Sequence, residues 1–274
     1  YTSPNLTLSN PTGNVSVTAT MSNTSVQVVT NQDGSITTTT IAYDSNNNPT
    51  DKTIETVDTL GNVSTQEITY VNGAEVVIGY TIDTSNNSTT GSLELNGSGI
   101  NTGVIPFDGS GLIEIYLKCK VDISNLPNSD STSQQRYILG AYVVSNSKTT
   151  GFGVYFRKTS SGRFLKTFYG NGSTTTYLDL RNGGNGDGST GYGALTGEHT
   201  YEITLTQLTS SSWHIKIVYD ENTTLYDGSV SVSINSSTIE VSVGQRINAS
   251  GNSIDQTPME IYDFNVTKTL TNNS

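Results

Sequence analysis

The sequence predicts an all-β protein, and two observations carry this prediction. Ser, Thr and Asn together make up 105 of the 274 residues. Thr favours strands, whereas Asn and Ser favour turns, so this composition suits short strands with many reversals. No stretch shows apolar residues at a sustained helical spacing, and good helix formers are sparse. The length is enough for one large β-sandwich or for two domains.

The net charge of −11 argues against two classes of partner. The acidic excess is uneven, because residues 1–90 contain one basic residue, Lys52, and eight acidic ones. Binding to nucleic acid and docking on an anionic membrane both require clustered Lys and Arg side chains. The chain also lacks a run of about twenty apolar residues that could span a bilayer. We therefore expect no nucleic-acid binding and no membrane insertion.

The N-terminal third divides into an arm and a repeat. Residues 1–24 are polar and are interpreted as an arm or linker. Residues 25–88 form a Thr- and Asn-rich region in which turn signals recur about every thirteen residues. A β-meander is therefore expected, with strands at 35–43, 52–59, 63–70 and 74–82.

This repeat offers few large apolar side chains for a core of its own. A run such as 36–41 reads Ile-Thr-Thr-Thr-Thr-Ile. A meander with so few large apolar side chains is expected to be marginally stable alone, because it can bury little apolar surface. Its strands could pack on the C-terminal domain, or they could pair with other copies in an oligomeric shaft. Long Thr- and Asn-rich strand repeats resemble those of trimeric viral fibres, which favours the shaft. A flexible stalk has a similar composition.

A second domain built from short strands is predicted over residues 89–274. A glycine-punctuated loop leads into the long run 112–122, and the closing run 259–267 places Tyr262, Phe264 and Val266 on one face. The other expected strands are 93–95, 137–144, 151–157, 162–169, 201–206, 213–219, 230–234 and 239–243.

The stretch 197–228 is the clearest element of this domain. Its two runs alternate apolar and polar residues on either side of a polar turn at 209–212, which predicts an antiparallel hairpin. The only cysteine, Cys119, lies in another such alternation and is expected to be buried and inert. The predicted core comprises Ile113, Ile115, Leu117, Ile203, Leu205, Trp213, Ile215, Ile217, Val241 and Phe264.

The order of motifs over residues 89–270 resembles that of concanavalin A-like lectin or laminin-G-like jelly rolls. An opening LELNGSG…GVIPF leads into a long strand, followed by GEHTYEITL, a Trp-led strand ending in VYD, a LYDG hairpin, IEVSVG and a closing MEIYDFNV. The resemblance implies an antiparallel two-sheet jelly-roll sandwich, one sheet of which is often used for glycans or protein partners.

Enzymatic activity is not expected. Glycanases that the domain resembles carry carboxylates two residues apart on one strand, where they flank the scissile bond. The nearest candidates here, Glu114 and the Glu260/Asp263 pair, do not share a strand face in this way and are interpreted as solvent-side charges. His199 and His214 share no neighbouring acid or Ser-centred motif, and neither has the spacing of metal ligands.

Binding is the expected role, and five residues are candidates. The glycine-rich loop 181–193 offers the polar groups of Asn185 and Asp187 and the ring of Tyr192. Tyr116 and Tyr155 lie on runs whose opposite face is the expected core, so their rings are expected to be exposed for contact with glycan or protein. A plain rim turn and ordinary edge tyrosines are the alternatives. No cofactor is expected, although the oxygens of the loop could hold calcium.

These features together predict a non-enzymatic structural and adhesion protein of a virion, either a phage fibre or a capsid decoration. Its jelly-roll head would bind a host surface glycan, and its N-terminal region would associate with other copies, as a homotrimer, or with other virion proteins. The expected location is the virion surface or the extracellular space. The alternative is a carbohydrate-binding module of a bacterial surface adhesin or a secreted glycanase.

Overall fold

The computed structural model confirms the all-β prediction. It describes residues 5–9, 15–21, 23–87, 89–96, 99–107, 111–126, 135–142, 150–159, 162–171, 175–178, 196–232, 234, 236–247, 253–254 and 256–270, and these contain strands and turns but no helix. The strands are β1 Asn5–Ser9, β2 Val15–Met21, β3 Thr24–Thr30, β4 Ile36–Tyr43, β5 Pro49–Val57, β6 Val63–Val71, β7 Ala74–Asp83, β8 Leu93–Leu95, β9 Ile100–Pro106, β10 Gly111–Asp122, β11 Gln135–Tyr142, β12 Thr150–Thr159, β13 Gly162–Asn171, β14 Thr175–Leu178, β15 Glu198–Thr209, β16 Ser212–Tyr219, β17 Thr223–Ser231, β18 Thr238–Val243, β19 Arg246–Ile247, β20 Ser253–Ile254 and β21 Met259–Leu270.

The chain divides into two compact units. Unit 1 comprises Tyr1–Leu93 together with Asp263–Lys268, and unit 2 comprises Glu94–Tyr262 together with Thr269–Ser274. Within the described ranges no helix is long and apolar enough to cross a membrane.

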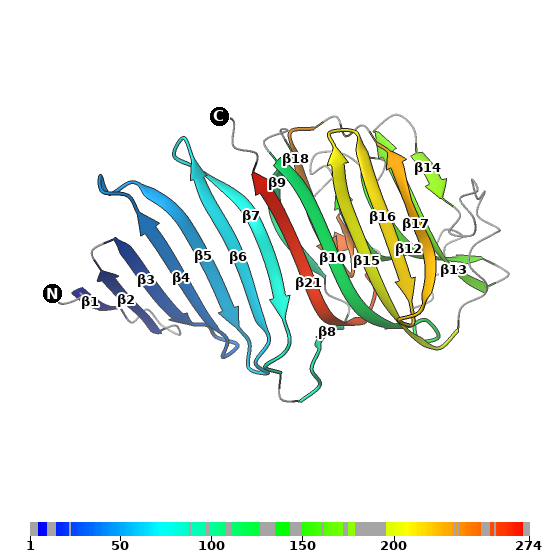
Figure 1. Ribbon diagram of the computed structural model, residues 1–274. Coiled ribbons are helices and arrows are strands. Elements are labelled where there is room, and N and C mark those ends of the chain that lie inside the picture. The colour runs from blue at the N-terminus through cyan, green and yellow to red at the C-terminus, as the bar shows by residue number, and fades with distance from the viewer. Residues whose placement is uncertain are drawn as a thin grey trace. The chain divides into compact units, whose positions relative to one another are not determined.

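Unit 1 is an antiparallel meander in which β1 to β7 pair in chain order (Figure 1). The Asp263–Thr267 part of β21 then pairs antiparallel with β7. The four strands predicted between residues 35 and 82 are present. The interpretation of residues 1–24 as an arm or linker is corrected, because β1 and β2 continue the meander through this segment.

Two turns of unit 1 use the same pattern, an Asp followed four residues later by an Asn. Asp44 Oδ1 accepts a hydrogen bond from the backbone N of Asn48 at 2.9 Å, and its Oδ2 accepts one from Asn48 Nδ2 at 3.1 Å. Asp58 and Asn62 repeat these bonds at 2.9 and 2.7 Å. Such self-contained turns explain why the repeat reverses direction without a hydrophobic core at its ends.

The sheet of unit 1 has two faces of different character, because directly paired residues point to the same side. The acidic face carries Val26, Val28, Thr38, Thr40, Asp51, Thr53, Glu55, Val57, Val63, Thr65, Glu67 and Asp83. The tyrosine face carries Thr37, Thr39, Ile41, Tyr43, Lys52, Ile54, Ile68, Tyr70, Glu75, Val77, Tyr80 and Ile82.

Unit 2 is a sandwich of two antiparallel sheets, compatible with a jelly roll. One sheet has the order β21-β10-β15-β16-β17, and the other has the order β14-β13-β12-β11-β18-β9 (Figure 1). Aromatic rings join the two layers: the Trp213 ring on β16 lies 4.7 Å from that of Phe152 on β12, and Phe156 on β12 lies 5.6 Å from Tyr201 on β15.

The predicted core residues are all buried. Each has a relative exposure of 1% or less. For the eight that lie on β10, β15 and β16, this follows from the alternation along those strands. Cys119 is fully buried as predicted. Phe264 is also buried, although its segment groups with unit 1, where its ring lies 5.9 Å from that of Tyr80.

Two expectations for this region are wrong. The glycine-punctuated stretch before residue 112, expected as a loop, contains β9, whose register with β18 pairs Ile105 with Ile239 in the core. The closing strand changes phase, because Ile261 and Phe264 are both buried with two residues between them. Tyr262 is therefore not on the buried face of Phe264 and Val266, but half-buried on the polar side.

Candidate functional site

The outward face of the β10 sheet in unit 2 is a regular array of polar side chains. Along β10, alternate residues point away from the core: Glu114, Tyr116, Lys118, Lys120 and Asp122. Antiparallel pairing sets these residues opposite Thr206, Thr204, Glu202, Thr200 and Glu198 of β15. The register thus sets acidic, basic and aromatic groups close together on one surface.

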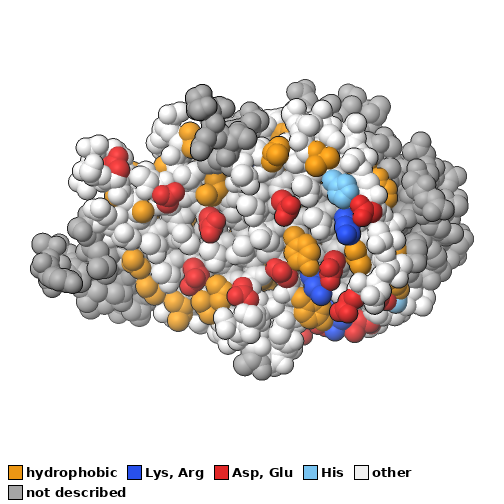
Figure 2. Space-filling view, viewed as in Figure 1, with side chains coloured by type: hydrophobic (Ala, Val, Ile, Leu, Met, Phe, Trp, Pro, Cys, Tyr) orange, Lys and Arg blue, Asp and Glu red, His pale blue; other side chains and the backbone are white. Residues whose placement is uncertain are grey.

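Basic or imidazole side chains pair with carboxylates on this surface. Lys118 Nζ lies 2.9 Å from Glu202 Oε1, and His214 Nε2 lies 2.8 Å from Asp227 Oδ1. Figure 2 shows basic and acidic side chains next to one another on this surface. The sequence did not indicate an acidic partner for His214, because this partner, Asp227, lies on β17, across the sheet.

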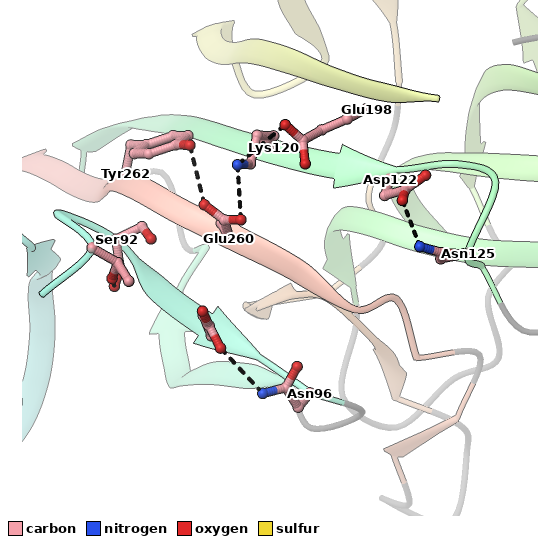
Figure 3. A network of polar contacts seen from close by, with 10 residues as sticks. Ser92, Asn96, Lys120, Asp122, Asn125, Glu198, Glu260 and Tyr262 are labelled. Carbon is pink, nitrogen blue, oxygen red and sulfur yellow. Dashed lines mark hydrogen bonds and ion pairs between the residues drawn. The ribbon is translucent and has the colours of Figure 1, made fainter. Parts of the chain in front are cut away.

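Lys120 is the centre of a denser cluster (Figure 3). Its Nζ lies 2.8 Å from Glu260 Oε1 on β21 and 3.3 Å from Glu198 Oε1 on β15. The Tyr262 hydroxyl donates to Glu260 Oε2 at 3.2 Å. The hydrogen bond to Glu260 raises the pKa of Lys120, with a further contribution from the bond to Glu198, so the ammonium form is favoured.

A small groove opens beside this cluster. Its volume is about 230 Å³, below the roughly 300 Å³ at which pockets for drug-sized ligands begin. Four carboxylates and one ammonium line it, which leaves a net charge of −3 when all are ionised. The lining residues are Glu94, Asn96, Lys120, Asp122, Glu198, Pro258, Met259 and Glu260.

Hydrogen bonds fix the carboxylate of Asp122 at the edge of the groove. Its Oδ1 accepts from the backbone N of Ser124 at 2.9 Å, and its Oδ2 accepts from Asn125 Nδ2 at 2.6 Å. Asn96 Nδ2 lies 3.5 Å from Glu94 Oε2, at the limit for a hydrogen bond (Figure 3). The groove therefore presents fixed oxygen acceptors and an amide, which are groups that bind hydroxyl-rich ligands.

His199 belongs to a second polar network in unit 2. Its Nδ1 lies 2.8 Å from Asp220 Oδ2, and because a carboxylate accepts, Nδ1 carries the proton. Nε2 lies 3.0 Å from both the Tyr219 hydroxyl and the Thr196 carbonyl oxygen. The sequence did not indicate that His199 pairs with Asp220, because the two residues lie 21 positions apart. Asp220 itself lies in the turn that follows β16 and has a φ of 44°. Sequence spacing does not reveal this backbone geometry.

The five predicted binding residues have different outcomes. Tyr116 lies half-buried on the polar face, as expected for a residue opposite the core. Tyr155 is fully buried and stacks on Tyr137 at 5.1 Å, so its expected exposure is wrong. The physical reason is that residues 151–156 are buried on both faces of β12. Asn185, Asp187 and Tyr192 lie outside the described residues.

The expected role for calcium rested on Asn185 and Asp187 and likewise falls outside the described part of the chain. Among the residues that the structure does describe, no group of three His, Cys, Asp or Glu side chains could hold a metal ion. The Lys120 groove was not predicted, because its members come from β8, β10, β15 and β21 and share no local motif.

No protein-family model matches the chain, and no curated protein sequence is significantly similar to it. The resemblance to concanavalin A-like and laminin-G-like domains is thus a statement about motif order, and the structure is compatible with it at the level of a two-sheet antiparallel sandwich.

Proposed function

We propose that this chain is a non-enzymatic structural and adhesion protein of a virion, a phage fibre or capsid decoration, whose unit 2 binds a glycan on the host surface. The groove at Lys120 carries the proposal. It combines fixed carboxylates, an amide and an ammonium group on the outward face of a sandwich sheet. Hydroxyl-rich ligands need this mixture of donors and acceptors.

The charge and size of the groove narrow the ligand. Its net charge of −3 disfavours sugars that carry a carboxylate or phosphate and favours neutral or amine-bearing ones. The volume of about 230 Å³ suits the end of an oligosaccharide rather than an enclosed ligand. Tyr116 and Tyr262 are the aromatic groups of this sheet face on which a longer chain could stack.

In this proposal unit 1 is the part that assembles. It associates with other copies of the chain, as a homotrimer, or with other virion proteins, and it places unit 2 at the virion surface. The support is that unit 1 forms one sheet in which most described side chains of β3 to β6 stay at least partly exposed, so burial is still to be gained.

The alternative is a carbohydrate-binding module of a bacterial adhesin or secreted glycanase. The observation in its favour is that every lining residue of the groove belongs to unit 2, so binding would not need the assembly of unit 1. A monomer that binds glycan would support this alternative, whereas a trimer would support the fibre.

A glycan array that includes neutral, amine-bearing and sialylated oligosaccharides tests the binding proposal. We expect the full chain to prefer neutral or amine-bearing glycans, and Glu260→Gln and Asp122→Asn to weaken binding at least about tenfold, or 1.4 kcal/mol. Glu202→Gln is the matched control, because Glu202 lies on the same face but outside the groove. An equal loss of glycan binding in all three variants, or a preference for sialylated glycans, would contradict the proposed binding at the groove. New reducing ends released from bound glycans would contradict the non-enzymatic part.

A further inference from the structure

We infer that the tyrosine face of unit 1, and not its acidic face, is the surface on which copies of this chain pack against one another. This inference rests on the proposed self-association and names the surface that carries it. The occupant is a second copy of the same face, turned toward a shared symmetry axis.

Charge separates the two faces. The acidic face carries Asp51, Glu55, Glu67 and Asp83, and no Lys or Arg of the described part of unit 1 points to that side. Packing this face on a copy of itself would bring like charges together in a chain that already has a net charge of −11. The acidic face is therefore unsuited to self-association.

The tyrosine face lacks this obstacle. Its one described carboxylate, Glu75, lies 3.0 Å from Lys52 Nζ and also accepts from the Tyr70 hydroxyl at 2.9 Å. This network lowers the pKa of Glu75, mainly through the hydrogen bond from Lys52. The pair is internally neutralised and can approach its copy without repulsion between unpaired charges.

The tyrosine face also carries apolar side chains that a second copy could bury. Ile68 and Ile82 are 4% and 3% exposed within a single chain. Around them Ile41, Ile54 and Tyr80 are only half-buried. A second copy would bury these remaining groups, at about 25 cal/mol per Å² of apolar area removed from water.

The available area predicts a weak interface. With strands about 4.8 Å apart and a rise of about 3.3 Å per residue, a patch five strands wide and seven residues long covers roughly 500 Å². Two such patches in contact remove roughly 1,000 Å², near the lower limit for a specific interface. Association should therefore be reversible and depend on protein concentration.

Adjacent threonines on β4 provide the test. Thr39 is on the tyrosine face and Thr38 on the acidic face, and both are half-buried. Thr39→Lys should raise the dissociation constant of the oligomer at least about tenfold through like charges at the axis. Thr38→Lys adds the same charge beside Glu55 and should leave assembly unchanged. Light scattering of the full chain at several concentrations gives the mass relative to the 29.2 kDa monomer.

The outcomes separate this inference from the proposed function. Dissociation by Thr38→Lys but not by Thr39→Lys would overturn the inference, as would a wild-type chain that is monomeric at every concentration. A dimer that is sensitive only to Thr39→Lys would support the face and contradict the homotrimer. Ile54→Lys, checked for its fold by circular dichroism, is a second probe of the same face. Glycan binding by unit 2 is measured independently on the array.

Discussion

The side-chain amide of Asn87 donates a 3.0 Å hydrogen bond to Oδ1 of Asn62, a residue 25 positions earlier in the chain. Its second N–H bonds to the carbonyl oxygen of Ser92 at 2.8 Å, and both asparagines are buried. The turn after β5 is thereby tied to the segment after β7, within unit 1.

The first prediction concerns this bond. Asn87→Ala should destabilise unit 1 by about 1–3 kcal/mol, because the buried Oδ1 of Asn62 loses this donor and the Ser92 carbonyl oxygen loses one of its donors. Asn86→Ala is the matched control, since the neighbouring Asn86 is exposed and its removal should change stability by less than about 0.5 kcal/mol. Urea denaturation of the full chain measures both. Equal effects of the two variants would show that the buried bond contributes nothing specific.

The second prediction uses two glycines with similar backbone angles. Gly61 has a φ of +93°, and a Cβ there would lie 2.6 Å from the carbonyl oxygen of Asn86. Gly73 has a φ of +80°, but a Cβ there would meet nothing within 4 Å. Gly73→Ala should lower the free energy of unfolding by about 1–2 kcal/mol, because alanine is strained in the left-handed conformation. Gly61→Ala should lower the free energy of unfolding clearly more, because the backbone at Asn86 must also move to make room for the Cβ. The melting temperatures of the two variants measure this difference in stability. Identical melting temperatures would contradict the close approach of the Asn86 carbonyl oxygen to Gly61.

Acid should destabilise the turns of unit 1. Hydrogen bonds from the backbone and then the side chain of Asn48 lower the pKa of Asp44, and bonds from Ser35 lower the pKa of Asp33. A carboxyl whose pKa is lower in the folded state contributes stability above its unfolded pKa of about 3.9, and this is lost as the pH falls through the folded value. Melting temperature should therefore drop below about pH 4, and less steeply in Asp44→Asn. A profile that is unchanged by this substitution would argue against the turn bonds.

The thiol of Cys119 should be unreactive in the native protein. Complete burial raises its pKa, so the reactive thiolate is not populated at neutral pH. We expect negligible reaction with a thiol reagent until denaturant is added, followed by labelling of one thiol per chain. Rapid labelling of folded protein would mean that β10 opens or is paired in another register.

A fragment of residues 1–88 should lack a complete sheet. It contains β1 to β7 but not Asp263–Thr267, so β7 loses the partner that pairs with Gly79–Asp83. Together with the small apolar content of β4 and β5, this should leave the fragment disordered and monomeric, since ordering the backbone costs about 1–2 kcal/mol per residue. Hydrogen exchange would show weak protection in the fragment and strong protection in the full chain. Strong protection in the monomeric fragment would show a self-sufficient sheet.

Local alternation was enough to predict the core of unit 2. Through the middle of β10, β15 and β16 alternate residues are apolar and buried, so period and burial coincide. The same reasoning failed for Tyr155, because β12 is buried on both faces and alternation there carries no information about exposure. In the repeat of unit 1 the turn residues predicted the reversals, since Asp33, Asp44 and Asp58 each accept hydrogen bonds from residues two to four positions later.

The candidate site could not be predicted for a different reason. Lys120 meets Glu198 and Glu260 only because β15 and β21 flank β10, and residues so far apart in sequence give no local signal. The pair His199 and Asp220 also depends on cross-strand register. Pairing partners of this kind follow from topology, which single-sequence patterns do not fix.

The share of β21 in unit 1 has a consequence for synthesis. Residues 263–268 leave the ribosome only after all of residues 94–262, so the edge of β7 stays open while unit 2 is being translated. An N-terminal domain normally folds first as the chain emerges. Here unit 1 is completed only after residues 94–262 have been made, and until then its open edge is a place where nascent chains on one message could pair with each other.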